Sequence, residues 1–322
     1  FLKSEEQKSG YFIIRGEPGI GKTAFTAQLI KQRGYPHHFN IASEGMTQRQ
    51  FLLNVSSQVI AYHQLDYLSL PHEAGEDNNF LMQVLQEAAR KDGNVVLAID
   101  ALDEAPELHD SREINPLNLP KELPDGVYIV VSTRRTERYI ELDVHDYTPF
   151  EIEEASEGNL QDIREYVYQF LQQESMSTRL DKWQIDFESF IEVMLLKSEG
   201  NFMYLYYVLP AIERGEFETG KVEELPLGLR GYYQRHWKKM KGEDLQNFVQ
   251  FHQHVIGQLA IAREPVSASW VAFMTELDVA YVNWAIDAWW EFLHESIQEG
   301  KSYYRIYHQS YKDFLTQKVV EI

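Results

Sequence analysis

Cysteine is absent from the 322 residues of this chain. Disulfide bonds and thiolate metal sites are therefore excluded, and the absence fits a reducing compartment such as the cytoplasm, where we expect the protein. Long apolar runs are missing too. A membrane-spanning helix needs about 20 consecutive apolar residues, and the longest runs here have only a handful. Neither a membrane span nor a signal peptide is expected.

Positive charge is in short supply. The chain has 30 Lys and Arg against 50 Asp and Glu, a formal net charge of −20. A large nucleic-acid surface needs clustered Lys and Arg, and anionic membranes attract the same residues, so the charge disfavours both as partners. Hydrophobic residues make up 44% of the chain, enough for a substantial core. The length suggests two or three domains. A start at Phe1 rather than Met suggests a piece of a longer protein.

An α/β domain is expected over residues 1–150, where short apolar strands alternate with helical segments. The expected strands are Tyr11–Arg15, His38–Ala42, Val95–Asp100 and Val127–Thr133. Strands that are apolar throughout and separated by helices are typical of a parallel sheet that is covered on both faces.

Strands become scarce after about residue 150. Residues 151–224 are expected to form a small helical domain, with helices at 160–173, 182–199 and 201–213. The acidic run Glu151–Glu157 before them is expected to be a solvated linker.

The last stretch, 225–322, is mainly helical in pattern but ends differently. A turn at 298–301 lies between two strand-like segments and predicts a β-hairpin, followed by a helix at Ser310–Lys318. Helices followed by a hairpin indicate a winged-helix domain. An aromatic helix, Ala280–Phe292, which carries Trp284, Trp289 and Trp290, is expected to pack the core of this domain.

Residues 16–23, GEPGIGKT, fit the phosphate-binding loop pattern G-x-x-x-x-G-K-[ST]. Gly16 and Gly21 are expected to adopt backbone angles that other residues resist, so that loop N–H groups face phosphate oxygens at the start of a helix. Lys22 would reach the β- and γ-phosphates, and Thr23 would ligate Mg²⁺. The residues expected to hold the nucleotide here are Gly16, Glu17, Pro18, Gly19, Ile20, Gly21, Lys22, Thr23 and Ala24.

Two later strands end in charged residues. The strand at 95–100 places Asp100 at its carboxyl end, where open α/β sheets bind ligands, and this carboxylate could hold the same Mg²⁺. Asp103 and Glu104 follow on a short turn and could orient or deprotonate a water. The strand at 127–133 is followed by Arg134, which could neutralise a γ-phosphate; the alternative is an ion pair with a nearby acid.

The three motifs, in this order and with this C-terminal half, resemble the STAND class of P-loop ATPases. The NACHT branch is the most similar, particularly bacterial NACHT proteins that often carry a WD-repeat array. The likeness covers essentially the whole chain. Beside the loop at 16–23, it rests on HHFNIA at 37–42, AIDALDEA at 98–105, VVSTRR at 130–135, LPLGLRGYYQRHW at 225–237 and YRIYHQSYKDFL at 304–315.

This resemblance implies a regulatory switch. A P-loop nucleotide-binding domain, a helical domain and a winged-helix domain would close over ADP, and exchange for ATP would open them and allow self-association. Slow Mg²⁺-dependent ATP hydrolysis would reset the switch. Effector segments before this stretch and sensor segments after it are expected. No motif indicates which signal is sensed, what the output is, or whether this stretch oligomerises.

The resemblance also assigns residues. Lys22 and Arg134 would act on the phosphates, Asp100 would ligate Mg²⁺, and either Asp103 or Glu104 would activate water. His308 matches a histidine that such proteins place from the winged helix onto the β-phosphate of ADP.

Many relatives carry a Gly-x-Pro motif whose proline lies against the adenine. Here Glu199-Gly200-Asn201-Phe202 stands in its place. Either Phe202 stacks on the base instead, or that contact is absent.

The main alternative is an AAA+-type DNA-handling ATPase with a winged-helix DNA-binding domain. The domain order fits, and RHWKKMK at 235–241 is the clearest basic cluster, but the net charge opposes it. A metabolic phosphotransferase would need an Arg-rich lid, which the sequence does not show. A nucleotide-locked scaffold without hydrolysis is disfavoured because Asp100, Asp103 and Glu104 are all present.

Overall fold

The structure, a computed structural model, describes residues 8–41, 47–105, 115–135, 144, 146–217 and 222–320. Contacts between residues divide the chain into two compact units. The N-terminal unit comprises residues up to Glu17 together with Gly21–Ile152, and the C-terminal unit comprises Pro18–Ile20 together with residues from Glu153 onward. Within the described ranges, no helix combines the length and hydrophobicity needed to cross a bilayer.

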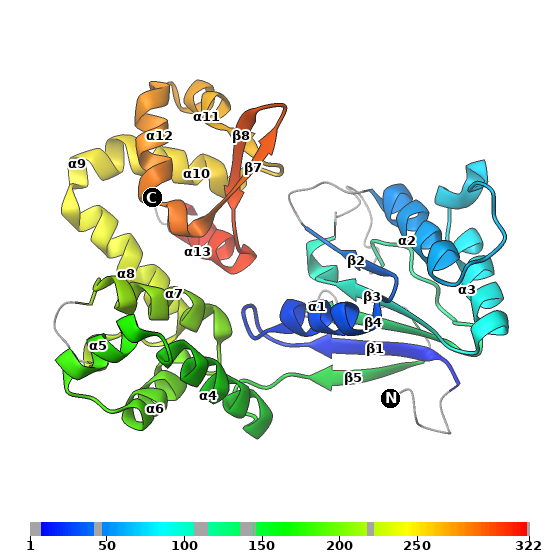
Figure 1. Cartoon of the computed structure of the whole chain (residues 1–322). Coiled ribbons are helices and arrows are strands. Elements are labelled where there is room, and N and C mark those ends of the chain that lie inside the picture. Colours follow the sequence, from blue (N-terminus) through cyan, green and yellow to red (C-terminus); the bar gives the residue numbers. More distant parts are fainter. Residues whose placement is uncertain are drawn as a thin grey trace. The chain divides into compact units, whose positions relative to one another are not determined.

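The N-terminal unit is built on a parallel sheet of five strands, as the sequence predicts. The strand order is β2-β3-β4-β1-β5, and each neighbouring pair is parallel (Figure 1). The elements are β1 (Gly10–Arg15), α1 (Lys22–Arg33), β2 (His37–Phe39), α2 (Gln48–Tyr62), α3 (Asn79–Asp92), β3 (Val95–Asp100), β4 (Val127–Thr133) and β5 (Tyr147–Glu151).

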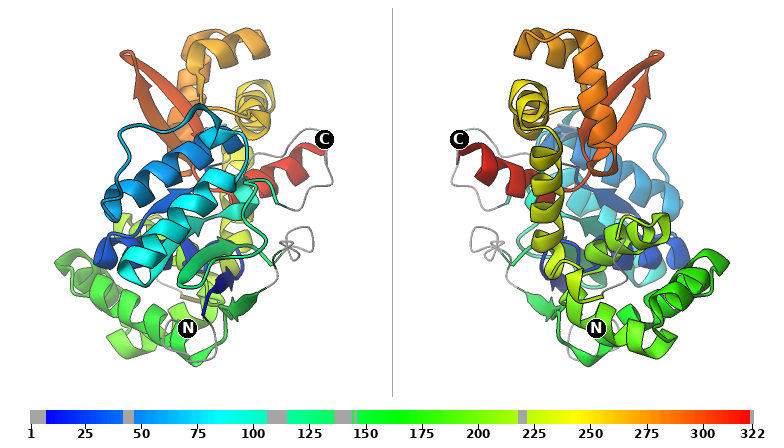
Figure 2. Two further views of the ribbon diagram at one scale, coloured as in Figure 1. Left: turned by 90° about the vertical axis from the view of Figure 1, so that its right-hand side faces the viewer. Right: turned by 90° about the vertical axis from the view of Figure 1, so that its left-hand side faces the viewer.

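Alternation along the strands gives this sheet two covered faces. Ile13 and Leu97 belong to the larger core, which they share with α2 and α3. Ile14 and Val96 point to the opposite face, where Leu29 of α1 packs against them. Figures 1 and 2 show α2 and α3 on one side of the sheet and α1 on the other. The parallel strands are therefore apolar on both faces, and their polar groups concentrate at the ends.

Two strands differ from the sequence prediction. β2 begins and ends earlier than the predicted strand at His38–Ala42, and Ala42 lies outside the described residues. β5 was not expected, because it is mostly exposed and contains Pro149. It lies at the edge of the sheet, where a proline interrupts no interior hydrogen-bond ladder.

The C-terminal unit is a helical region followed by a small antiparallel sheet of order β6-β8-β7, which confirms the predicted fold class. Its elements are α4 (Glu157–Leu171), α5 (Glu174–Trp183), α6 (Phe187–Ser198), α7 (Phe202–Arg214), α8 (Gly228–Glu243), α9 (Leu245–Asn247), α10 (Gln253–Ile261), β6 (Val266–Ser267), α11 (Ala268–Thr275), α12 (Val279–Ala288), β7 (Leu293–Gln298), β8 (Lys301–Ile306) and α13 (Gln309–Val320).

One continuous core runs through this unit, from Ile163 on α4 to Leu315 on α13. α10, α11 and α13 pack against the hairpin strand β8 (Figures 1 and 2). The predicted boundary between a helical domain at 151–224 and a winged-helix domain at 225–322 stays a prediction.

The predicted helix at 182–199 is in fact the end of α5 and the whole of α6. The chain breaks at Gln184, which has a positive φ of 56° and ends α5. The side chain of Asp186 then caps α6 by accepting from the N–H of Ser189 at 2.9 Å. The break is therefore a consequence of capping and backbone conformation rather than of hydrophobic periodicity.

The predicted aromatic helix is shorter than expected, since α12 ends at Ala288. The segment does pack the core, but of its three tryptophans only Trp289 is buried, and Trp284 and Trp290 are 43% and 50% exposed. Val282 and Ile286 share the buried stripe of α12 with Trp289, and Trp284 lies off that stripe.

Candidate phosphate-binding site

The loop between β1 and α1 makes two turns that need glycine. Gly19 and Gly21 have φ of 85° and 108°, which side-chain-bearing residues rarely adopt. Gly16 has no positive φ, so the prediction of special backbone angles is correct for Gly21 and wrong for Gly16. Around these turns Glu17 is exposed and Ile20 is buried.

The N-terminus of α1 has its first N–H groups available. Gly21 is the capping residue, no side chain caps the helix, and its first turn holds no acidic residue. The positive end of the helix dipole therefore meets no competing carboxylate from its own turn. Thr23 and Ala24 are exposed in this turn. Such a helix start is suited to binding an anion.

Lys22 is buried, with 9% of its surface exposed. Its ammonium donates to the backbone oxygens of Gly16 at 2.7 Å and Glu17 at 3.0 Å. The side chain thus folds back over its own loop and is partnered by neutral carbonyl groups, which anionic oxygens can replace with stronger, charge-assisted bonds.

The pKa of Lys22 shows which other charges are near. Burial lowers the pKa of the ammonium. The carboxylate of Asp103 opposes this shift most strongly, the guanidinium of Arg134 adds to it, and Asp100 opposes it more weakly. The fold therefore brings together four residues that the sequence singled out separately.

Asp100 lies at the end of β3 and is 2% exposed. The hydroxyl of Ser132 donates to its Oδ1 at 2.5 Å and accepts from the N–H of Ala101 at 2.8 Å. The side-chain amide of Asn40 donates to the Asp100 backbone oxygen at 2.8 Å. Ser132 and Asn40 were not among the predicted site residues. For Ser132 the available signal was a hydroxyl at the carboxyl end of an apolar strand.

The backbone bends sharply after Asp100. Ala101 has a φ of 51°, in the left-handed region that alanine disfavours, and a 3₁₀ turn at Leu102–Glu104 follows. This turn aims Asp103 at Arg134: the guanidinium Nε lies 2.7 Å from Oδ2, and the Arg134 N–H donates to Oδ1 at 3.2 Å. The alternative expectation for Arg134 was a surface ion pair; the structure shows an ion pair, but both partners are largely buried. The role of Arg134 toward a phosphate stays a prediction.

The oxygen donors at this end of the sheet suit Mg²⁺. The Thr23 hydroxyl and the Asp100 carboxylate are hard oxygen donors, and Mg²⁺ is commonly bound by one or two such groups together with phosphates and water. The described residues contain no cluster of three or more His, Asp or Glu that could hold a metal alone. Thr23 and Asp100 therefore fit an Mg²⁺ ion that phosphate oxygens also hold.

Phe202 and His308 belong to the C-terminal unit. Phe202 is the first residue of α7, and its ring meets Tyr166 edge-on with 5.8 Å between centroids. His308 precedes α13, with Nδ1 2.6 Å from the hydroxyl of Ser310. The Ser310 hydroxyl is also bonded to Tyr233, which restricts the orientation of the imidazole. The roles of Phe202 and His308 toward a nucleotide stay predictions.

The tip of the loop, Pro18–Ile20, groups with the C-terminal unit. The Asn201 amide donates to the Pro18 backbone oxygen at 2.8 Å, and the Met203 N–H donates to the Gly19 oxygen at 3.2 Å. A Cβ on Gly19 would lie 2.6 Å from Asn201 Oδ1. Asn201 was not predicted as a site residue, although it stands inside the segment that replaces Gly-x-Pro.

No protein-family model and no curated protein matches the chain. Among solved structures, it is similar to a Signal Transduction ATPase with Numerous Domains (STAND) protein with a tetratricopeptide repeat sensor from Pyrococcus horikoshii, at 13% identity and a TM-score of 0.45. That match covers 95% of this chain and 40% of the other, so this chain spans well under half of its length.

Two further solved structures resemble the chain. Drosophila ORC bound to DNA matches at 14% identity and a TM-score of 0.39, covering 97% of this chain and 90% of the other. Cdc6p from Pyrobaculum aerophilum matches at 11% identity and a TM-score of 0.36, covering 97% and 88%. At such identities and TM-scores, these likenesses indicate nothing about function.

Proposed function

We propose that this chain is the adenine-nucleotide-binding core of a STAND-type signal-transduction ATPase of the NACHT branch, acting as an ADP/ATP switch. One observation carries the proposal: a glycine-turned loop and an uncapped helix start lie beside Lys22, Asp100 and the Asp103–Arg134 pair. Backbone N–H groups, an ammonium and a guanidinium supply the donors that phosphate oxygens need. Thr23 and Asp100 supply oxygen ligands for the accompanying Mg²⁺.

The Asp103–Arg134 ion pair supports slow rather than rapid hydrolysis. The guanidinium of Arg134 forms an ion pair with the Asp103 carboxylate, and the backbone N–H of Arg134 donates a hydrogen bond to the same carboxylate. A γ-phosphate would compete with Asp103 for the guanidinium, because both are oxyanions. ATP would then release the carboxylate to act on water, whereas ADP would leave the pair intact. Whether Asp103 or Glu104 activates water stays open.

The switch itself would be a shift between two populations. ADP would favour a closed form in which His308 reaches its β-phosphate, and ATP would favour an open form that self-associates. Effector and sensor segments on either side of this stretch, and a cytoplasmic location, complete the proposal.

The DNA-handling alternative is weakened by contacts within the basic cluster at 235–241. His236 Nδ1 lies 2.9 Å from a Glu291 carboxylate oxygen, so this side chain is engaged within the unit. The guanidinium of Arg235 lies 3.8 Å from the centroid of the Phe217 ring and lines a pocket. Together with the net charge of −20, this disfavours the long phosphate backbone of DNA as a partner.

The nucleotide content of the purified protein tests the proposal. The chain is purified without added nucleotide and denatured, and the released molecules are identified by chromatography. We expect stoichiometric ADP from the parent and from His294→Ala, a control at an exposed histidine of β7. His308→Ala should release much less. An empty parent that rapidly turns over added ATP would overturn the switch, and salt-dependent DNA affinity would favour the alternative.

A further inference from the structure

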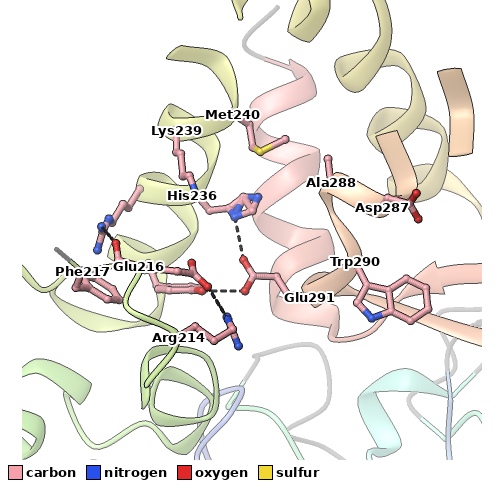
Figure 3. A pocket seen from close by; sticks show the side chains of 12 residues that line it. Arg214, Glu216, Phe217, His236, Lys239, Met240, Asp287, Ala288, Trp290 and Glu291 are labelled. Atoms are coloured by element: carbon pink, nitrogen blue, oxygen red, sulfur yellow. Dashed lines mark hydrogen bonds and ion pairs between the residues drawn. The ribbon is translucent and has the colours of Figure 1, made fainter. Parts of the chain in front are cut away.

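A pocket of about 480 Å³ opens in the C-terminal unit, and none of the predicted nucleotide-site residues lines it (Figure 3). Its walls come from the end of α7 and the chain that follows it, from one face of α8, and from the last residues of α12 together with Trp290 and Glu291. Small-molecule sites commonly enclose about 300–1,000 Å³, so this pocket has room for a ligand of modest size. It also contains part of the basic cluster that the proposed nucleotide switch leaves without a role.

Arg235 has unused hydrogen-bonding capacity in this pocket. Its guanidinium stacks on Phe217, and Nη2 makes only a long contact of 3.4 Å to the backbone oxygen of Glu216. Nη1 is buried and has no hydrogen-bond partner among the described residues. A buried donor left unsatisfied is destabilising. A guanidinium whose plane is fixed by stacking is suited to bidentate pairing with a carboxylate or phosphate.

Three carboxylates line the pocket, those of Glu216, Asp287 and Glu291, and two of them are paired with groups other than Arg235. Glu216 lies 2.7 Å from Arg214. Glu291 contacts His236 (Figure 3), with 2.9 Å between Nδ1 and a carboxylate oxygen, and it accepts from the Tyr232 hydroxyl at 3.0 Å. Burial raises the pKa of the Glu291 carboxyl, but the hydrogen bonds from His236 and Tyr232 and the charges of His236 and Arg214 together outweigh burial, so its pKa lies below the ordinary value. Glu291 therefore stays ionised and engaged at neutral pH.

The pocket also offers an apolar wall. Trp290 lines it with half of its surface exposed, and Met240 lines it while partly buried. An exposed indole is a suitable surface for stacking a planar group, and a thioether adapts to an irregular apolar shape. One class of ligand satisfies both sets of groups: an oxyanion attached to an aromatic body.

We propose that this pocket binds a small organic anion, an aromatic ring bearing a carboxylate or a phosphate, with Arg235 holding the oxyanion and Trp290 contacting the ring. In a chain whose net charge of −20 repels anions in general, binding at this point requires donors that are placed locally. The proposal does not depend on the nucleotide switch, since every lining residue belongs to the C-terminal unit.

Calorimetric titration with phenylacetate and with phenyl phosphate tests the pocket and separates the two oxyanions. The titrations use the whole chain carrying Lys22→Ala, which removes the phosphate-binding lysine of the loop. Acetate and inorganic phosphate measure the affinity for the anion alone, and benzyl alcohol measures the affinity for the ring alone. We expect at least one aromatic anion to bind more tightly than either of its parts. Equal binding of the parts and the whole would overturn the proposal.

Matched variants locate the binding. Arg235→Gln should weaken the binding of the aromatic anion at least about tenfold, which is the typical effect of losing a charge-assisted hydrogen bond. Lys301→Gln, which removes one exposed cation at the start of β8, should not. If Arg235→Gln fails to fold, Trp290→Ala decides: it should weaken binding, and Trp284→Ala, an exposed tryptophan outside the pocket, should leave it unchanged. Equal affinities within either pair would exclude this pocket as the site.

Discussion

The two units place their buried polar groups differently. The N-terminal unit gathers Lys22, Asp100 and the Asp103–Arg134 pair at one end of a sheet, where Ala101 is conformationally strained. The C-terminal unit interlocks aromatic rings through one continuous core, and a small group of its charged residues lines a side pocket. The charged groups of the N-terminal unit can exchange their present partners for a ligand. The packed aromatic core of the C-terminal unit resists rearrangement. Substitutions should therefore change ligand affinity in one unit and free energy of unfolding in the other.

The largest expected effect is on the stability of the C-terminal unit. Phe292 is fully buried and stacks on Tyr311 with 4.0 Å between ring centroids. Phe292→Ala should lower the free energy of unfolding by about 3–5 kcal/mol, as loss of a buried ring usually does. Urea unfolding followed by circular dichroism measures this.

Tyr311→Phe is the matched control for that substitution. The Tyr311 hydroxyl is buried without a partner among the described residues, so removing it should be neutral or stabilising. Equal losses in Phe292→Ala and Tyr311→Phe would show that aromatic packing is not what stabilises this unit.

Lys22→Ala in the N-terminal unit should have the opposite effect: nucleotide affinity should fall, and the free energy of unfolding should not. Losing a charge-assisted contact to phosphate should weaken the binding of ADP and ATP by about a hundredfold. The free energy of unfolding without nucleotide should not fall, because a buried ammonium is itself costly to desolvate. Calorimetry and urea unfolding report the two quantities. Lys31→Ala, in the last turn of the same helix, is the control, and an equal loss of affinity there would contradict a specific role for Lys22.

Ser132→Ala probes the groups behind Asp100 and should have a smaller effect. Without the 2.5 Å bond from the serine hydroxyl, the Asp100 carboxylate is less well oriented. Loss of such a supporting bond typically weakens a metal site about tenfold or more. Titrating Mg²⁺ against nucleotide binding should therefore show a higher half-saturating concentration. Ser57→Ala, at a surface hydroxyl of α2, should leave the midpoint in place. An unchanged midpoint in Ser132→Ala would remove Asp100 from the proposed metal site.

The ionisation of buried tyrosines has the smallest effect near neutral pH, and an alkaline titration measures it. Burial raises the pKa of Tyr207, Tyr232 and Tyr233 above the ordinary 10.0 in the C-terminal unit, and of Tyr11 and Tyr67 in the N-terminal unit. A raised folded pKa contributes stability that is complete below pH 10 and is lost as pH rises beyond it. The tyrosinate absorbance of the buried residues should therefore rise together with loss of circular dichroism. Ionisation of all the tyrosines near pH 10 with structure retained would contradict this burial.

Much of the fold follows from local patterns. β3 and β4 are apolar throughout, so their existence and bounds could be predicted from sequence. β5 could not, because its exposed, proline-containing segment becomes a strand only by pairing with β1. The break between α5 and α6 was missed for a similar reason: the left-handed Gln184 interrupts a segment whose hydrophobic pattern continues.

The candidate site divides in the same way. The loop motif identified Lys22 and Thr23, and the strand ends identified Asp100 and Arg134. Gly19, rather than Gly16, makes the first left-handed turn, which the motif spacing does not specify. Asn201 was missed because its contact with Pro18 joins residues 183 positions apart.

The sequence by itself determined the parallel α/β class, the phosphate-binding loop and the acidic residues at the strand ends. These depend on short-range rules: alternation along a strand, glycine conformational freedom and the spacing of a loop before a helix. Tertiary structure alone decided that Asp103 pairs with Arg134, that Ser132 supports Asp100, that Trp290 is exposed and that Arg235 lines a pocket. Each depends on which distant segments pack together and on which polar groups lose water when they do, and no local pattern encodes those long-range contacts.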